Sequence, residues 1–548
     1  MERLSSKYKD ARSKYKHATV PFFYSDPVMS FIENINNKLI LVSAALLALT
    51  CQLKAQTFKG IKAEVETQAI GTTSGVVPFW MRSNQFGSTP SPGASASFMA
   101  RFHRDYNTPS SIDSTSGKKK LIDWGFGFEG RANAGKDSEI QLIEAYAKVR
   151  AGIFQLKGGR TKDVMGLNGD TTLSSGNFSV SGNALGIPKI ELSIPDYYTI
   201  PAFNGLFAIK GNFTHGWVGK TRILDVITGS QSSNQVYQIQ NTHPTTYFHQ
   251  KSLYVRLGRK DWKLKLYGGF NHQVYWGNEK EAYGPNFKLS PLKSFFYVAT
   301  GKSYGAAGVP TSKIGNQLGS VDLGAEYDFT SVKVMVYRQT FYDVGALSKL
   351  ANIRDGLNGI SFENKNYDRK NRGFEWKKAL FEFFYSKDQA GYPWSIPTKS
   401  GDEDYYNNFY YMEGWSYNGL GVGNPLITTR DDARKGQAYR YADNFINNRV
   451  VAVHFGLSGS VKEWDFTTKL TYSKNYGTFG TSIYGGSTGS IRNPQTTNIF
   501  VPVDQFSFYL EGMRPLNKGY SVGFATALDQ GKLLYNSYGL LLKLRKSW

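Results

Sequence analysis

The sequence predicts an all-β fold: a transmembrane antiparallel β-barrel of about 18 strands, of the outer-membrane type, with long extracellular loops and short periplasmic turns. Three observations predict it. A hairpin near the middle of the chain alternates apolar and polar residues. The last strand alternates in the same way up to an aromatic C-terminal residue, and the connections between such strands sort into short and long ones.

The hairpin, at residues 252–271, has one apolar and one polar face. Its apolar positions are Leu253, Val255, Leu257, Leu264, Leu266 and Phe270. Its polar positions are Tyr254, Arg256, Lys263, Lys265, Tyr267 and Asn271. Period-two alternation across a short polar turn is typical of a β-hairpin, and a soluble sandwich could show it too. Basic residues along the strand bodies favour a water-filled lumen, so Arg256, Lys263 and Lys265 are candidate basic residues of that lumen.

The last strand supports a barrel independently. One of its faces carries Tyr538, Leu540, Leu542, Leu544 and Trp548. The other carries Gly539, Leu541, Lys543, Arg545 and Ser547. An alternating final strand that ends in an aromatic residue is typical of bacterial outer-membrane barrels, which place aromatic girdles at the membrane interfaces.

Similar alternation recurs along the chain, at residues 321–327, 332–337, 381–385, 451–455, 466–472 and 506–511. Counting back from Trp548, short periplasmic turns are expected at residues 515–519, 458–463, 329–331 and 258–261. The long segments 474–503, 387–449 and 277–317 are the expected extracellular loops. Residues 173–198 break the strand pattern with Gly, Ser, Asn and Pro, so they either fold into the lumen as a plug or form periplasmic structure.

Residues 1–55 are expected to be an N-terminal extension and a secretory signal peptide, and residues 56–548 the barrel domain. Lys38 precedes an apolar run at residues 39–49, and cleavage is expected after Ala55 or Gln56. Lipid attachment at Cys51 is the alternative. Beyond this region no stretch approaches the roughly 18 consecutive apolar residues of a membrane helix, so the expected location is the outer membrane, crossed by strands.

Cysteine usage and charge limit the classes of function that the chain can have. Cys51 is the only cysteine, so the processed chain has no thiol for disulfides, thiolate catalysis or cysteine zinc sites. The first 55 residues carry eight basic and four acidic side chains, so their removal lowers the net charge from +22 to +18. This excess belongs to solvated loops and a basic lumen, or it attracts polyanions such as an acidic polysaccharide or lipopolysaccharide. Nucleic acid is not expected as a partner of an exported chain.

No motif points to catalysis. Residues 125–130 match GxGxxG, but the surrounding alternation predicts a strand where a dinucleotide site needs a helix N-terminus. Residues 485–489 match GxSxG without a strand–elbow–helix context. The seven histidines form no HxH or HExxH pattern, and the acidic residues 402–404 are either solvated or bind calcium. We therefore expect a non-enzymatic protein with no catalytic residue, metal or cofactor.

The loop between Tyr392 and Tyr441 is rich in aromatic and amide side chains. Rings stack on the C–H faces of sugars while amides bond their hydroxyls, so the loop predicts saccharide binding; the alternative is that the rings pack the loop into a lid over the pore. The candidate saccharide-binding residues, with one from a neighbouring loop, are Trp276, Trp394, Tyr405, Tyr406, Tyr410, Trp415, Tyr417, Asn418 and Asn424.

Several stretches together resemble the capsule assembly Wzi family of outer-membrane proteins, in the form found in Bacteroidetes. They are residues 173–176 (LSSG), 181–184 (SGNA), 187–190 (IPKI), 194–197 (IPDY), 215–217 (HGW), 248–257 (FHQKSLYVRL), 269–277 (GFNHQVYWG), 313–320 (KIGNQLGS), 354–357 (RDGL), 414–417 (GWSY) and 446–449 (INNR). The resemblance spans nearly all of the processed chain.

The resemblance implies a monomeric barrel that attaches or organises exported capsular polysaccharide at the cell surface as a lectin. Outer-membrane lipid and lipopolysaccharide are further expected partners, and the sequence leaves open whether the polysaccharide export machinery is contacted. The rival function is a diffusion channel (porin), whose ion preference the lumenal charges would set. The two differ in whether the lumen is plugged, so a position of residues 173–198 inside the barrel favours the lectin.

Overall fold

The computed structural model describes residues 60–106, 121–224, 241–343, 345–371, 373–390, 403–408, 410–488, 491–493 and 495–548. The expected signal peptide, Cys51 and Trp394 lie outside these residues. Alternating residues build 18 strands into one antiparallel sheet. The strands are β1 (Lys62–Thr72), β2 (Ser95–Arg104), β3 (Ile122–Gly135), β4 (Glu139–Ala151), β5 (Phe154–Arg160), β6 (Lys189–Thr199), β7 (Phe207–Lys220), β10 (Thr245–Leu257), β11 (Leu264–Trp276), β14 (Asn316–Asp328), β15 (Val332–Tyr342), β16 (Gly356–Asn364), β17 (Phe374–Tyr385), β22 (Val450–Val461), β23 (Trp464–Asn475), β26 (Val503–Pro515), β27 (Tyr520–Gly531) and β28 (Ser537–Ser547).

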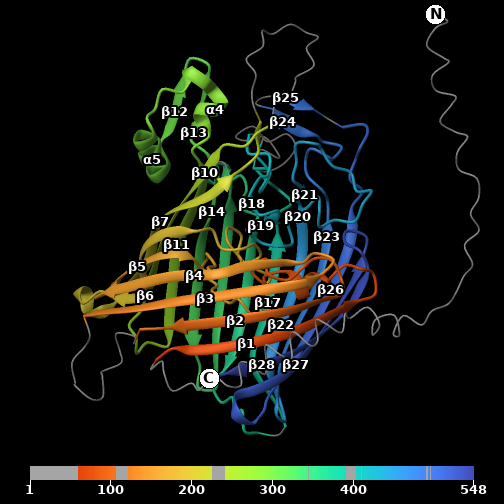
Figure 1. Cartoon of the computed structure of the whole chain (residues 1–548). Coiled ribbons are helices and arrows are strands. Elements are labelled where there is room, and N and C mark those ends of the chain that lie inside the picture. Colours follow the sequence, from red (N-terminus) through yellow and green to blue (C-terminus); the bar gives the residue numbers. More distant parts are fainter. Residues whose placement is uncertain are drawn as a thin grey trace, which may run out of the picture. The chain divides into compact units, whose positions relative to one another are not determined.

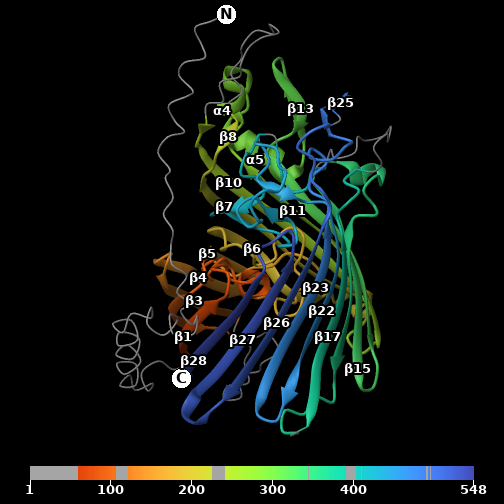
Figure 2. The same ribbon diagram turned by 90° about the vertical axis from the view of Figure 1, so that its right-hand side faces the viewer.

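The sheet closes on itself. The first strand pairs with the last, from Glu64 opposite Ser547 to Thr72 opposite Gly539, and on its other side β1 pairs with β2. Closure pairs the backbone groups of every strand edge, which is the condition for spanning a bilayer with strands. Figures 1 and 2 show the strands from two sides, with the C-terminus at the lower end. The predicted antiparallel barrel of 18 strands is confirmed.

The two ends of the barrel differ in the length of their connections. At the end that holds the C-terminus, β10–β11, β14–β15, β22–β23 and β26–β27 are joined by short turns at the predicted places. One turn is shorter than expected, because β22 continues to Val461 and leaves only Lys462 and Glu463 between the strands. The predicted long loops join β11 to β14, β17 to β22 and β23 to β26 at the opposite end.

The wall is apolar outside and polar inside. Neighbouring residues show the alternation: Leu253 is 47% exposed and Tyr254 only 2%, while Leu540 is 43% exposed and Leu541 6%. The outward residues form an apolar belt around the closed sheet, which is the surface that a transmembrane barrel presents to lipid. This belt includes Phe128, Val149, Leu156, Leu192, Phe213, Leu253, Leu266, Phe270, Leu323, Phe381, Val453 and Leu542.

Short helices and two-stranded pieces occupy the connections. They are α3 (Phe79–Arg82), η2 (Ala202–Gly205), β8 (Ile223–Leu224), β9 (Asn241–Thr242), α4 (Glu279–Tyr283), η3 (Gly284–Asn286), α5 (Pro291–Thr300), β12 (Ser303–Ala306), β13 (Val309–Lys313), η4 (Ala346–Lys349), β18 (Ser416–Tyr417), β19 (Leu420–Gly421), β20 (Thr428–Thr429), β21 (Phe445–Asn447), β24 (Gly486–Thr488), β25 (Ile491–Asn493) and η5 (Asn517–Gly519). Among the described residues, none of the helices has the length and apolar character needed to cross a membrane.

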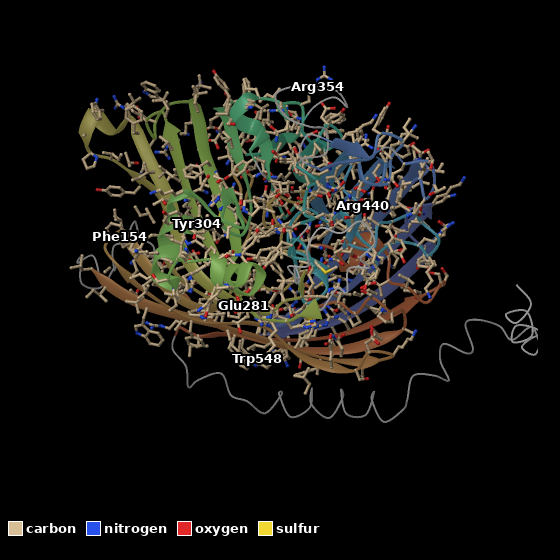
Figure 3. All side chains as sticks on the ribbon, turned by 90° about the horizontal axis from the view of Figure 1, so that it is seen from above. Phe154, Glu281, Tyr304, Arg354, Arg440 and Trp548 are labelled. Atoms are coloured by element: carbon tan, nitrogen blue, oxygen red, sulfur yellow. The ribbon has the colours of Figure 1, made fainter. Side chains whose placement is uncertain are left out.

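Three connections from the long-loop end fold into the lumen, and we call them together the plug. They are residues 73–94, residues 161–188 and the described part of residues 386–449. Seen from above, Arg440 of the third segment projects inside the outline of the strands (Figure 3). The prediction for residues 173–198 is therefore correct for residues 173–188, which lie in the lumen. It is wrong for the remainder, because β6 begins at Lys189 and belongs to the wall.

Candidate functional site

Residues 161–188 cross the lumen and are held by buried carboxylates of the wall. Glu382 of β17 accepts hydrogen bonds from the backbone N–H of Ser175 at 2.7 Å, from the hydroxyls of Ser174 and Ser175 at 2.7 and 2.6 Å, and from Asn168 at 3.2 Å. Asp322 of β14 accepts the backbone N–H of Leu167 at 2.6 Å. Glu382 and Asp322 are 4% and 0% exposed. These carboxylates replace the water that the segment's N–H and O–H groups would otherwise bind.

Other strands hold the plug from the remaining sides. The carbonyl of Leu173 lies 2.7 Å from Nε2 of His454 on β22, and the hydroxyl of Ser179 donates to Asn271 on β11 at 2.8 Å. On the opposite wall, Asp163 of the plug pairs with Lys189 of β6 at 2.6 Å and with Lys157 of β5 at 3.2 Å.

Residues 73–94 attach to a further part of the wall. The indole N–H of Trp80 donates to Thr471 of β23 at 2.9 Å, and the backbone N–H of Phe79 donates to Asp529 of β27 at 2.7 Å. Wall contacts on both sides of the plug show that it spans the lumen from β5 and β6 to β11, β14, β17, β22, β23 and β27.

Most of the predicted saccharide-binding aromatics lie inside this plug. Tyr405, Tyr406 and Trp415 are fully buried. The indole N–H of Trp415 donates to the carbonyl of Ser179 at 2.7 Å, and its ring stacks on Tyr275 with 4.2 Å between centroids. Tyr406 donates to the carbonyl of Phe178. The expectation of exposed rings is wrong for these residues, because their faces and polar groups are occupied by residues 161–188 and by the wall.

The other candidates have varied surroundings. Tyr410 donates to the carbonyl of Asn278 at 2.7 Å, and Tyr417 accepts from Arg160 at 3.0 Å; both rings are buried. Asn424 is also buried and donates to the carbonyl of Gly176. Trp276 ends β11 on the outward face of the wall and is 5% exposed.

Only Asn418 among the described candidates is exposed, and Trp394 lies outside the described residues. The alternative prediction, that the rings pack the loop together, therefore applies to the buried aromatics. Asn418 remains exposed, as a saccharide contact requires.

Two carboxyl groups of the loops are buried next to these aromatics. Asp355 accepts the hydroxyl of Tyr405 and the N–H of Gln389, both at 2.7 Å, and burial raises the pKa of Asp355 to about 7. Burial, reinforced by the neighbouring Glu403, also raises the pKa of Asp343. Glu403 itself accepts the N–H groups of Asp343, Gly345 and Ala346, so this member of the predicted acidic cluster organises a turn. Within the described ranges, no three His, Cys, Asp or Glu side chains are grouped to hold a metal.

The predicted lumenal basic residues fall into three situations. Lys265 faces the lumen on β11 but pairs with Glu326 at 3.3 Å. Lys263 lies in the turn before β11 and is exposed, so its assignment to the lumenal wall is wrong: the strand begins one residue later. Arg256 faces the lumen on β10, is 9% exposed and donates to Thr199 at 3.3 Å.

Arg256 belongs to a group of wall residues that we call the basic–aromatic cluster: Tyr197, Lys210, Tyr254, Arg256 and Tyr267. The ammonium of Lys210 lies 5.0 Å from the ring centre of Tyr197 and 5.3 Å from that of Tyr254, and the guanidinium of Arg256 lies 5.8 Å from the ring of Tyr197. Tyr197 and Tyr267 meet edge to face at 5.5 Å.

In the described part of the chain, neither Lys210 nor Arg256 forms an ion pair. Some other lumenal cations are paired, as with Arg101 and Glu129 at 3.0 Å and with Lys543 and Glu511 at 2.6 Å. Lys469, which lies over the ring of Trp80, resembles Lys210 in having no ion pair among the described residues. Lys210 is attracted at longer range by Asp196 and Asp322. Cations held over rings without a directly paired carboxylate can bind an anionic ligand that also offers C–H faces to aromatics. Sequence reasoning found Arg256 but missed Tyr197 and Lys210. Tyr197 lies where the pairing of β6 is irregular, between Ile194 and Tyr198, and β7, which carries Lys210, is not among the strands that the sequence predicted.

Comparisons with known proteins give a fold likeness and no family. No family model matches the chain, and no curated protein matches it. Among solved structures, OccAB2 of Acinetobacter baumannii has 11% identity, covers 90% of this chain and 99% of its own, and has a TM-score of 0.40. OccK2 (OpdF) of Pseudomonas aeruginosa, in complex with glucuronate, has 8% identity, coverage of 89% and 99%, and the same TM-score. Likeness at this level carries no conclusion about ligand or activity.

Proposed function

We propose that this chain is an outer-membrane barrel that binds exported acidic polysaccharide and holds or assembles it at the cell surface. The observation that carries the proposal is the plug. Its segments bond to strands on opposite sides of the lumen, so the interior is built as a protein core. A lumen filled by a fixed plug favours a binding protein over a channel, because the plug obstructs free diffusion.

The site chemistry supports an acidic saccharide. Lys210 and Arg256 supply charge without an ion-pair partner in the described chain, and Tyr197 and Tyr267 supply ring faces. The basic side chains can bind the carboxylates of uronic acids, and the tyrosine rings can stack on the C–H faces of the sugars. In the loops at the long-loop end of the barrel, Asn418 offers an exposed amide. The protein acts here as a lectin and not as an enzyme, in keeping with the absence of a catalytic motif in its sequence.

The resemblance to the capsule assembly Wzi family points the same way. It supports a role in attaching capsular polysaccharide, with the export machinery and outer-membrane lipopolysaccharide as neighbours. The stretches that carry the resemblance include residues 173–176 and 181–184, which lie in the plug, and residues 446–449 at the base of the loop that completes it.

A deletion in the native cell tests the proposal. Capsule imaged on the cell and assayed in the medium should show polysaccharide shed into the medium with export intact. Complementation with Lys210→Gln and Arg256→Gln together should reproduce the shedding. Lys365→Gln, which removes a cation from a surface ion pair at the same end of the barrel, is the matched control and should restore attachment. Capsule that stays on the cell after deletion would refute the proposal.

The second candidate is a diffusion channel. A closed barrel with basic side chains on its lumenal wall, such as Arg256 and Lys265, would give a channel a preference for anions. Planar-bilayer recording of the purified full chain separates the two. Stable single-channel conductance carried by ions would favour the channel, and a closed barrel that still retains acidic polysaccharide on a column would favour the lectin.

A further inference from the structure

The loop between β11 and β14 folds back onto the outside of the barrel. Its helix α5 places Phe295 against the outward residues Phe213, His215 and Trp276, with ring centres 6.3, 5.7 and 6.0 Å apart. Lys251 of β10, also outward, donates to the carbonyl of Ala299. Figure 1 shows α5 beside the upper ends of β7 and β10. We call residues 277–315 the flap.

The flap lies directly above the apolar belt. Along the outward face, Lys251 stands opposite Phe213 and His272, and the next outward position toward the short-turn end pairs Leu253 with Phe270. Leu253 and Phe270 are 47% and 39% exposed. Successive residues on one strand face lie about 7 Å apart, so α5 is one step from lipid-facing side chains.

One side of α5 that does not face the barrel is apolar. Val298 is buried against Val274 and Trp276 of the wall, whereas Leu292 and Phe296, one turn apart on a different face, are 67% and 57% exposed. Leu292 and Phe296 therefore extend the apolar belt beyond the ends of the strands.

The rest of the flap surface is basic. Lys280, Lys288, Lys293, Lys302 and Lys313 are exposed, and none of them forms an ion pair within the described residues. The flap contains two acidic residues: Glu281 is exposed, and Glu279 is 6% exposed and accepts from Tyr411 at 3.2 Å. A helix that combines exposed Leu and Phe with surrounding lysines has the composition of a segment lying in a membrane interface.

We propose that the flap is a lipid-binding element that docks on the outer leaflet, with Leu292 and Phe296 among the acyl chains and the lysines on the phosphates of lipid A. The apolar residues continue the belt, and the lysines complement the phosphates that lie at the level of the head groups. The contact would fix the height of the barrel in the membrane and the position of the long loops above it. It is independent of polysaccharide binding.

Spin labels in the full-length chain test the lipid contact. In a Cys51→Ser background, Leu292→Cys and Phe296→Cys are labelled and the protein is placed in vesicles of phosphatidylcholine and lipid A. Both labels should collide more with oxygen than with a water-soluble nickel chelate, as a label at Leu253→Cys in the belt should. A label at Leu350→Cys, an exposed apolar residue of the β15–β16 loop, should show the reverse.

Removal of charge tests the phosphate contact. Lys288→Gln and Lys293→Gln should each weaken binding of lipid A about fivefold, as expected for one basic residue at an anionic surface. Lys349→Gln, outside the flap, should leave it unchanged. Water exposure of the labels at Leu292→Cys and Phe296→Cys would overturn the proposal. Labels that are protected from both oxygen and the nickel chelate because two barrels associate through this surface would also overturn it and would assign the surface to a second copy.

Discussion

Glu382 is the residue on which the anchoring of the plug depends most. The backbone N–H of Ser175 is fixed in direction, whereas the hydroxyls of Ser174, Ser175 and Tyr337 can turn to other acceptors, and the amide of Asn168 keeps its hydrogen bond to the Tyr337 hydroxyl at 2.8 Å. Glu382→Ala therefore leaves at least the Ser175 N–H unpaired in a buried site. At about 1–3 kcal/mol for such a donor, the anchoring should weaken by at least that amount.

Hydrogen exchange measures this loss directly. Amides of residues 173–181 should exchange at least about fivefold faster in Glu382→Ala, since each 1.4 kcal/mol is a factor of ten. The β-strands should stay protected, because 18 paired strands hold the wall without the plug. Glu363→Ala on the adjacent strand is the control: it breaks only a solvent-exposed pair with Lys333, worth about 0–1 kcal/mol. Equal exchange in both variants would refute the assignment of Glu382 as the anchor.

Three further predictions concern the same interior. Trp80→Ala removes a ring that is 1% exposed and should lower stability by about 3–5 kcal/mol, measured by thermal unfolding; a loss below 1 kcal/mol would contradict its packing role. Burial raises the pKa of Asp355 from 3.8 to about 7. The stability that its protonated form contributes to the fold is therefore fully present below pH 3.8 and is lost as the pH rises through 7. Exchange at Gln389, corrected for its intrinsic rate, should therefore be slower at pH 5 than at pH 8, and an opposite trend would exclude the protonated carboxyl. Lys210→Gln should weaken the retention of an acidic polysaccharide at least about tenfold, and neutral polysaccharide serves as the control.

The wall could be predicted because its pattern is local. Leu253 and Tyr254 are adjacent, and their alternation alone assigns one to lipid and the other to the lumen. The same holds for Leu540 and Leu541 in the last strand. Turn positions followed from the same period, with errors of a residue or two, as at Lys263, which lies in the turn and not in the strand.

The plug could not be predicted in detail because its contacts are distant in sequence. Trp415 donates to the carbonyl of Ser179, 236 residues away, and nothing near Trp415 in the chain indicates that partner. An aromatic residue beside amides has the same local sequence whether its ring packs inside or meets a sugar. Only the break in alternation at residues 173–188 signalled that a segment leaves the wall.

The seam between β1 and β28 also sets the order in which the molecule is assembled. It joins Glu64 to Ser547, so it can form only when nearly the whole chain has been delivered. Contacts between such remote residues form slowly, and until then both terminal strands expose unpaired edges on which other chains can aggregate. The plug adds a second demand of the same kind. The contact of Ser175 with Glu382 joins residues 207 positions apart, so it forms only when both β5–β6 and β17 are in place. Assembly of both the wall and its interior therefore depends on late contacts between remote parts of the chain.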